Sequence, residues 1–126
     1  MAWEIAHDKS LGLVEVVLAG VNTAEELREA TVAGIARVRK TRATRGLINA
    51  VKQVEAPAMA ELLELPSQYD DERLSHDTRI AYLGPERPEL HDAAEFFETV
   101  CVNRGWAVRR FADREEAISW LTSDSD

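Results

Sequence analysis

A short apolar run near the middle of the chain constrains the fold more than any other segment. Residues 46–51 read Gly-Leu-Ile-Asn-Ala-Val and lie between a basic segment and a polar one. Such runs are typical of strands that are buried on both faces in the middle of a parallel sheet. We therefore expect a central strand here, in which Asn49 and Val51 are largely buried. The loop at residues 52–56 then leads to Pro57, which suits the first position of a helix.

Strands and helices alternate along the rest of the chain. Residues 3–7 and 11–18 have the patterns of strands, and the polar turn between them predicts an antiparallel hairpin. Further elements are expected in this order: a helix after Thr23, a helix from Pro57, a strand at 79–83, a helix from Pro88, a strand at 106–111 and a helix after Asp113. This order predicts one α/β domain over residues 1–126. We expect a mixed, mostly parallel sheet of about five strands with about four helices.

The composition argues against several classes of function. A net charge of −8 at pH 7 would repel a phosphate backbone, so we expect no nucleic-acid partner. The longest apolar run, at residues 11–19, contains Glu15 and is too short to span a bilayer, so we expect no membrane insertion. Polar residues such as His7 interrupt any apolar leader, and the single Cys101 fits a reducing compartment. We therefore expect a cytoplasmic protein.

The sequence contains no set of side chains with the spacing of a catalytic or metal centre. His7, His76 and His91 are each followed by Asp, but neighbouring residues point apart, and surface histidines are the better interpretation. Cys101 falls on the apolar face of its helix, which favours a buried, inert thiol over a nucleophile. We expect no enzymatic activity, no cofactor and no metal ion.

Four aromatic side chains either line a ligand pocket or belong to the core. They are Tyr69, Tyr82, Phe96 and Trp120. Their helical or strand spacing favours the core. Only Phe96 falls off the buried stripe of its helix, where it could mark an oligomer surface or a lid. A homodimer is therefore one assembly that the sequence allows.

Basic residues gather at the expected end of the first helix. They are Arg37, Arg39, Lys40, Arg42 and Arg45. Cations at this position complement the negative end of the helix dipole, which is the interpretation we prefer. The alternative is a site for a phosphate or an acidic partner.

Three segments of the sequence are similar to those of a known family. The closing segment VRRFADREEAISWL covers residues 108–121, LAGVNTAEEL covers 18–27, and RIAYLG covers 79–84. Together with the order of the elements, they resemble the STAS domains, the anti-sigma-factor antagonist superfamily, and most closely a SpoIIAA-like bacterial branch. The resemblance covers nearly the whole chain and implies a single STAS domain. None of the three segments is a catalytic signature.

One loop departs from the pattern of the STAS antagonists that are switched by phosphorylation. In those proteins the loop after the third strand ends in an Asp-Ser-Ser-Gly-type turn, which matches Glu-Ala-Pro-Ala at residues 55–58. Pro57 therefore stands at the phosphoacceptor position, and no hydroxyl side chain lies between Arg45 and Glu64. The resemblance implies a non-catalytic module that binds a ligand or a protein, without the phosphoacceptor serine and with a regulatory role as one option. The alternative is a small carrier for an apolar or lipid-like molecule, because related folds include lipid carriers.

The expected binding surface lies where the parallel strands end. In open α/β sheets, ligands bind in the crevice outside the carboxyl ends of the strands. These exits are Asn22, the loop at residues 52–58 and the turn at residues 84–87. The candidate binding residues are Asn22, Lys52, Gln53, Glu55, Pro57 and Arg87. Their occupant is either an unknown protein partner or a small apolar ligand, and the sequence leaves both open.

Overall fold

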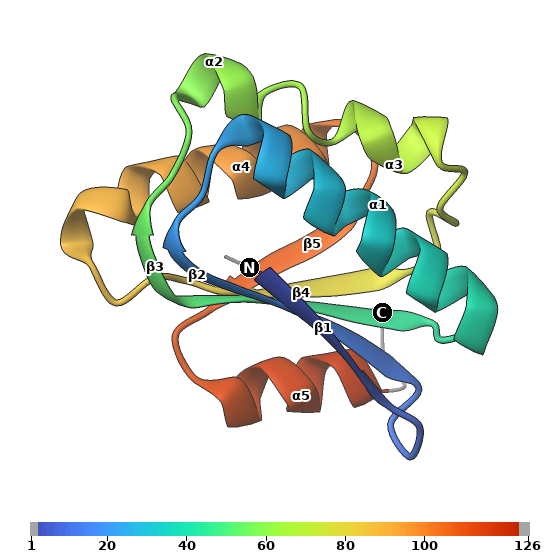
Figure 1. The fold of residues 1–126 in the computed structure, drawn as a ribbon. Coiled ribbons are helices and arrows are strands. Elements are labelled where there is room, and N and C mark those ends of the chain that lie inside the picture. Colours follow the sequence, from blue (N-terminus) through green and yellow to red (C-terminus); the bar gives the residue numbers. More distant parts are fainter. Residues whose placement is uncertain (1–2, 124–126) are drawn as a thin grey trace.

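The computed structural model describes residues 3–123, apart from the side chain of Met59, and these residues build one five-stranded sheet (Figure 1). The strands lie side by side in chain order: β1 (Trp3–Asp8), β2 (Leu13–Val21), β3 (Arg45–Glu55), β4 (Arg79–Leu83) and β5 (Ala107–Phe111). β1 pairs antiparallel with β2, and each later pair is parallel. The predicted mixed sheet, with its central third strand, is confirmed.

The helices of the described residues cover the sheet in two layers. One face carries α1 (Ala24–Thr41), α2 (Met59–Leu62), α3 (Ser67–Asp71) and α4 (His91–Asn103), which the 3-10 helix η1 (Pro88–Leu90) precedes. The other face carries α5 (Arg114–Thr122). Each layer has its own apolar core, with Leu27 and Phe97 on the α1 side and Leu47 and Leu121 on the α5 side.

Local signals in the sequence set where the two flanking helices begin. Thr23 caps α1 in a capping box, because its Oγ1 accepts from the Glu26 N–H at 3.1 Å while Glu26 Oε1 accepts from the Thr23 N–H at 3.0 Å. Asp113 caps α5 by accepting from the Glu115 N–H at 3.0 Å. Both predicted helix starts are confirmed.

The central strand is longer than predicted. The sequence analysis placed a loop at residues 52–56, but β3 continues to Glu55 because β2 runs on beside it. The paired residues are Ala19 with Lys52, Gly20 with Gln53 and Val21 with Glu55, with irregularities in the register before the first and last pairs. Polar side chains at a strand end hid this extension, since pairing with a neighbour is not visible in a single segment.

The helix after β3 also begins later than predicted. Pro57 is not its first residue, because the carbonyl of Ala58 accepts from the N–H groups of Glu61 and Leu62 and so stands at the helix cap. α2 is only four residues long, and a turn separates it from α3. The helix expected from Pro57 is therefore shorter than predicted, and α3 is a separate helix.

Burial along β3 is less uniform than predicted. Leu47 and Ala50 are buried, whereas Asn49 and Val51 are only half-buried, as is Ile48. α5 packs against β4 and β5, so the side of β3 that carries Asn49 and Val51 is incompletely covered. Ile48 points to the opposite face, where it borders a cavity.

Several other side chains lie where the sequence analysis expected them. Cys101 is fully buried, and burial raises the pKa of its thiol to about 12. His7 and His91 lie at the surface, as does His76, whose ring stacks on Trp106 at 3.7 Å between centroids. Phe96 differs from its expected position off the buried stripe, because it is half-buried and packs against the α1-side core. Within residues 3–123, no helix has both the length and the apolar character needed to cross a bilayer.

Candidate functional site

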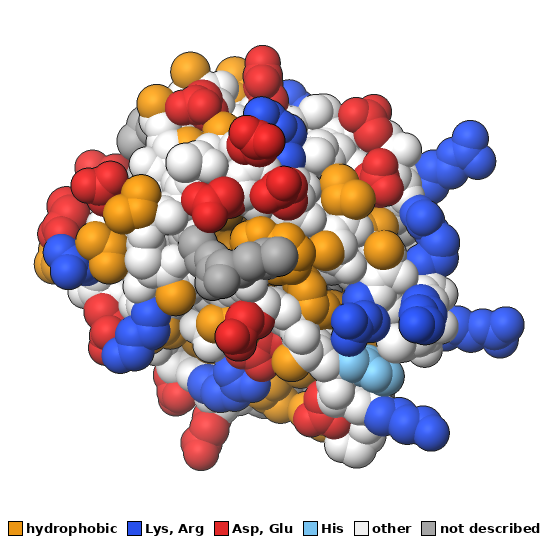
Figure 2. All heavy atoms as spheres, in the orientation of Figure 1, with side chains coloured by type: hydrophobic (Ala, Val, Ile, Leu, Met, Phe, Trp, Pro, Cys, Tyr) orange, Lys and Arg blue, Asp and Glu red, His pale blue; other side chains and the backbone are white. Residues whose placement is uncertain are grey.

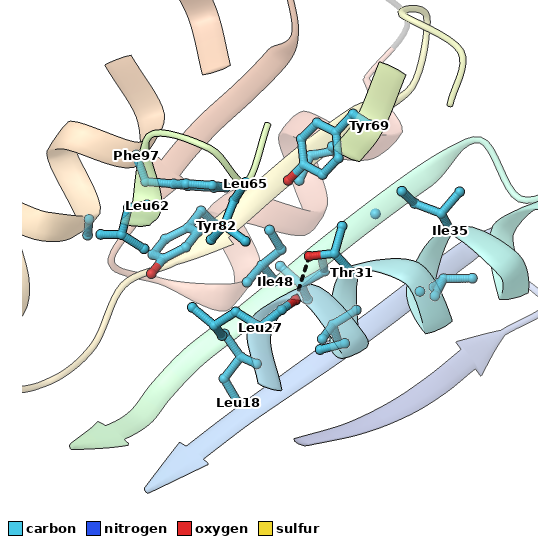
Figure 3. A pocket seen from close by; sticks show the side chains of 18 of the residues that line it. Leu18, Leu27, Thr31, Ile35, Ile48, Leu62, Leu65, Tyr69, Tyr82 and Phe97 are labelled. Carbon is cyan, nitrogen blue, oxygen red and sulfur yellow. Dashed lines mark hydrogen bonds between the residues drawn. The ribbon is translucent and has the colours of Figure 1, made fainter. Parts of the chain in front are cut away.

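An apolar cavity of about 110 Å³ lies between the sheet and the helices of the α1 layer (Figure 3). Its walls come from α1, α4, the segment around α2 and α3, and the faces of β2, β3 and β4 that α1 covers. The labelled side chains of Figure 3 show this arrangement: Leu18, Leu27, Thr31, Ile35, Ile48, Leu62, Leu65, Tyr69, Tyr82 and Phe97. Concave, mostly apolar pockets with few polar groups are the usual form of small-molecule sites.

Small residues on the facing elements leave this space open. α1 contributes Ala30 and Gly34, one turn apart, and α4 contributes Ala93 and Ala94. A Cβ built on Gly34 would lie 2.9 Å from Cγ2 of Val16, so α1 approaches β2 closely at one end of the cavity. The helix therefore sits tightly on β2 at this point, while its small side chains leave room further along.

The polar groups in the cavity wall are uncharged. The hydroxyl of Tyr69 points into the cavity (Figure 3), and among the described residues it makes no hydrogen bond. Burial raises the pKa of Tyr69 well above its ordinary value and raises the pKa of Tyr82 to about 12. The hydroxyl of Thr31 donates to the Leu27 carbonyl at 2.8 Å, so Thr31 presents its methyl group to the cavity instead of its hydroxyl. The wall thus offers neutral hydrogen-bonding groups in an apolar surface.

Among the described residues that line the cavity, none has an acidic, basic, histidine or cysteine side chain. General acid–base catalysis needs a group that titrates near neutral pH, and nucleophilic catalysis needs an activated nucleophile. Neither is present in this wall, and residues 3–123 contain no cluster of three His, Cys, Asp or Glu side chains suited to a metal ion. The described part of the wall can make apolar contacts and hydrogen bonds to neutral groups.

The six candidate residues from the sequence lie near one another at the ends of the strands but in different environments. Asn22 and Gln53 are buried, and Gln53 Nε2 donates to Asn22 Oδ1 at 2.9 Å. Lys52 is exposed and pairs with Glu86 at 3.2 Å, which joins the end of β3 to the turn after β4. Of the six, Gln53 alone lines the cavity.

The other three candidates lie around this strand-end edge. Glu55 and Arg87 are exposed, and Arg87 pairs with Glu89 at 3.6 Å. Pro57 is half-buried between β3 and α2. The edge is therefore a polar rim beside the cavity, and its part in binding stays a prediction.

Most of the cavity was missed by the sequence analysis. Two of the four aromatic candidates, Tyr69 and Tyr82, line it, whereas Trp120 packs against Phe111 on the α5 side. The available signal was the run of small residues on apolar helix faces, such as Ala30 and Gly34, since neighbours without large side chains leave space in a core.

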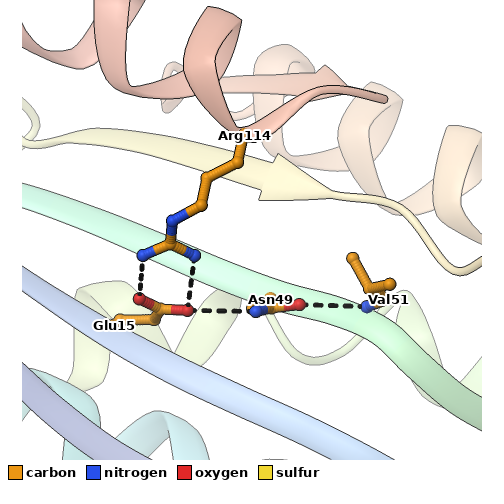
Figure 4. A network of polar contacts seen from close by, with 4 residues as sticks. All are labelled: Glu15, Asn49, Val51 and Arg114. Carbon is orange, nitrogen blue, oxygen red and sulfur yellow. Dashed lines mark hydrogen bonds and ion pairs between the residues drawn. The ribbon is translucent and has the colours of Figure 1, made fainter.

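A polar network on the opposite face of the sheet holds α5 in place (Figure 4). Nη1 and Nη2 of Arg114, at the start of α5, donate to Oε2 and Oε1 of Glu15 at 3.0 and 2.6 Å. Asn49 Nδ2 also donates to Glu15 Oε2 at 3.0 Å, and Asn49 Oδ1 accepts from the Val51 N–H at 3.1 Å. These bonds satisfy the polar groups one by one, so the network is structural.

Replacing Glu15 with glutamine is expected to lower the stability by about 1 kcal/mol at pH 7. The hydrogen bonds from Arg114, then from Asn49, hold the pKa of Glu15 below its ordinary value of 4.5. A carboxyl with a lowered pKa stabilises the fold above pH 4.5, and this contribution is lost as the pH falls through the folded-state pKa.

Urea unfolding of wild type and Glu15→Gln at pH 7, 5, 4 and 3 should therefore show their free energies of unfolding converging in acid. Glu4→Gln on the exposed face of β1 is the control, and a Glu15→Gln curve that runs parallel to wild type at every pH would contradict the role of the network.

Comparisons with known proteins place the fold. No protein-family model matches the chain, and no curated protein sequence matches it. Solved structures do match. The phosphorylated form of the Bacillus cell-fate determinant SpoIIAA is 18% identical, with a TM-score of 0.59 over 95% of this chain and 99% of that one. The anti-sigma-factor antagonist SpoIIAA in its unphosphorylated form is also 18% identical, with a TM-score of 0.59 over 95% and 97%.

A third solved structure has the same fold. It is an uncharacterised protein of the DUF3478 family from Shewanella loihica, described as having a SpoIIAA-like fold. It is 16% identical, with a TM-score of 0.59 over 95% of this chain and 92% of that one. At these identities the likeness concerns the arrangement of strands and helices. The chain has a SpoIIAA-like fold, as the resemblance of its sequence implied.

Proposed function

We propose that this protein is a non-catalytic binding module whose ligand is a small apolar molecule held in the cavity beneath α1. The observation that carries the proposal is the cavity itself, about 110 Å³ within the apolar core on the α1 side of the sheet. Protein interiors contain few voids larger than a water molecule, and an apolar void of this order accommodates a ring or a short alkyl chain. The uncharged wall favours a ligand without charge inside the cavity.

Native mass spectrometry of the protein purified from its host tests the proposal. The expected result is a second mass peak, heavier by one small molecule, that disappears after extraction with organic solvent. Refilling the extracted protein with 1-octanol should restore a one-to-one complex. A protein that carries nothing and takes up no 1-octanol would contradict the proposal.

A protein partner at the strand-end edge is the second candidate function. Two apolar side chains are exposed there, Val21 at 53% at the end of β2 and Leu63 at 44% after α2. Lys52, Glu55 and Arg87 are also exposed at the strand ends, and charged side chains are typical of the polar rim of an interface. SpoIIAA is an anti-sigma-factor antagonist, and this edge is where a regulatory partner of the present chain would dock. A pull-down from host extract should lose its partner in Leu63→Glu and keep it in Val102→Glu, since Val102 is equally exposed at the end of α4.

The segment at residues 52–58, the end of β3 and the turn that follows it, is expected to stay unphosphorylated in the host. A phosphate placed at a helix start adds roughly −2 charge, and a switch depends on that change. Pro57 occupies the position of the phosphoacceptor, and Glu55 already supplies a fixed negative charge nearby. Phosphopeptide mapping of protein from its host is the measurement. Modification of Ser67, Ser75 or Thr78 together with altered binding would show that a switch exists elsewhere in the chain.

A further inference from the structure

A surface groove of about 280 Å³ lies beside the cavity, where α1 ends against the loop between α3 and β4. Three arginines line it: Arg39 and Arg42 from the end of α1, and Arg73 from the loop. Figure 2 shows Lys and Arg side chains gathered on the side of the molecule where α1 ends, at the right of the view. The hydroxyl-bearing residues Thr44 and Ser75 also line the groove. The groove is cationic on a chain whose net charge is −8.

The groove and the cavity share a wall. Ile35 and Val38 of α1, with Leu74 and Thr78 of the segment before β4, line both hollows. A molecule that enters the cavity past these side chains would therefore leave its outer end among the arginines. The two hollows are therefore adjacent, and one is apolar while the other is cationic.

The arginine side chains keep much of their hydrogen-bonding capacity. Arg39 donates from Nη2 to the carbonyl of Glu72, while Arg42 and Arg73 form no ion pair within residues 3–123. Asp77 is the one acidic side chain among the described residues of the groove lining, and its backbone N–H donates to Ser75 Oγ at 3.1 Å. Guanidinium groups bind carboxylates and phosphates through two parallel hydrogen bonds.

Two of these arginines occupy positions that favour glycine. Arg42 has a φ of 60° and Arg73 a φ of 59°, and each follows the end of a helix. They are the non-glycine residues with positive φ in the described chain, and both line the groove. Helix ends commonly place glycine at such positions because a side chain is strained there. Arginine therefore stands at two sites where the backbone alone favours glycine.

We propose that the cavity and the groove together bind a single-chain amphiphile with an anionic headgroup, a carboxylate or a phosphate. This inference rests on the proposed function, because the chain of the amphiphile occupies the cavity. Arg42 and Arg73 hold the headgroup in the groove, with hydroxyls of Thr44 and Ser75 beside them. The uncharged cavity wall excludes the headgroup and so fixes which end of the amphiphile enters.

Three eight-carbon probes separate the parts of this proposal. Isothermal titration of the full chain with octanoate, octyl phosphate and 1-octanol is expected to give at least about tenfold tighter binding of one or both anions than of the neutral alcohol, as each charge-assisted contact predicts. The ratio of octanoate to octyl phosphate identifies the headgroup. Equal affinity for the alcohol and both anions would overturn the inference and leave the proposed function standing, whereas no binding of any probe would overturn both.

A pair of double variants assigns the preference to the groove. Arg42→Gly with Arg73→Gly removes two charges and relaxes both strained positions, so its melting temperature should equal or exceed that of wild type. We expect this variant to bind 1-octanol unchanged and to lose its preference for the anions. Arg37→Gln with Lys40→Gln removes the same charge from the same end of α1 but lies outside the groove lining, and it should keep the preference. Retention of the preference in the glycine variant, or its equal loss in the control, would overturn the inference.

Discussion

Replacing Ile48 with aspartate is expected to lower the free energy of unfolding by at least about 3 kcal/mol at pH 7. Ile48 lies at the centre of β3, with Val16 of β2 and Tyr82 of β4 as its neighbours in register. Its side chain packs on the α1-side core and borders the cavity. The change removes an apolar side chain from this core and places a carboxylate there without a charged partner.

Urea unfolding measures this loss, and its pH dependence identifies the cause. The buried carboxyl has a raised pKa, so the loss should shrink as the pH falls and the group becomes neutral. Val32→Asp makes a matched change on the outer side of α1, where Val32 is 38% exposed, and should cost about 0.5 kcal/mol. An Ile48→Asp protein as stable as the Val32→Asp protein would show that β3 is not the centre of the fold.

Replacing Ala30 with leucine is expected to weaken the binding of 1-octanol by more than about tenfold while the melting temperature stays level or rises. Ala30 is 2% exposed on the inner face of α1 and lines the cavity. The three added carbon atoms would occupy the space that the ligand needs. Each methylene buried without strain contributes about 0.8 kcal/mol, and any overlap with the far wall subtracts from that gain.

Two further alanine-to-leucine variants test whether the weaker binding depends on the filling of the cavity. Ala36→Leu makes the same substitution on the exposed side of α1, outside the cavity lining, and should bind 1-octanol as wild type does. Ala94→Leu fills the cavity from α4, so its effect should match that of Ala30→Leu. If both filled variants bind 1-octanol normally, the ligand lies elsewhere.

The features that were predictable from the sequence are those that depend on neighbouring residues in the chain. The capping box at Thr23 and the cap at Asp113 fix two helix starts through bonds that span two or three positions. The apolar run of β3 identified the central strand because a strand covered on both faces has few polar side chains. Such signals are complete within one segment, which is why they could be recognised without a structure.

The features that could not be predicted depend on segments far apart in the sequence. β3 reaches Glu55 only because β2 continues beside it. The bond between Glu15 and Arg114 joins residues 99 positions apart, and nothing near either residue indicates the other. The cavity likewise exists only where the small residues of α1 and α4 face the same part of the sheet. Gln53 was chosen as a strand-end residue, and its place in the cavity wall follows from this assembly.

The central claim is that a small apolar molecule binds between α1 and the sheet, and methyl NMR during a titration with 1-octanol tests it most directly. The account predicts shifts at Leu27, Ile48 and Leu65, which line the cavity, and unchanged signals from Leu13 and Leu121 in the core beneath α5. Shifts confined to the α5-side core, or to the exposed methyl groups of the strand-end edge, would contradict it.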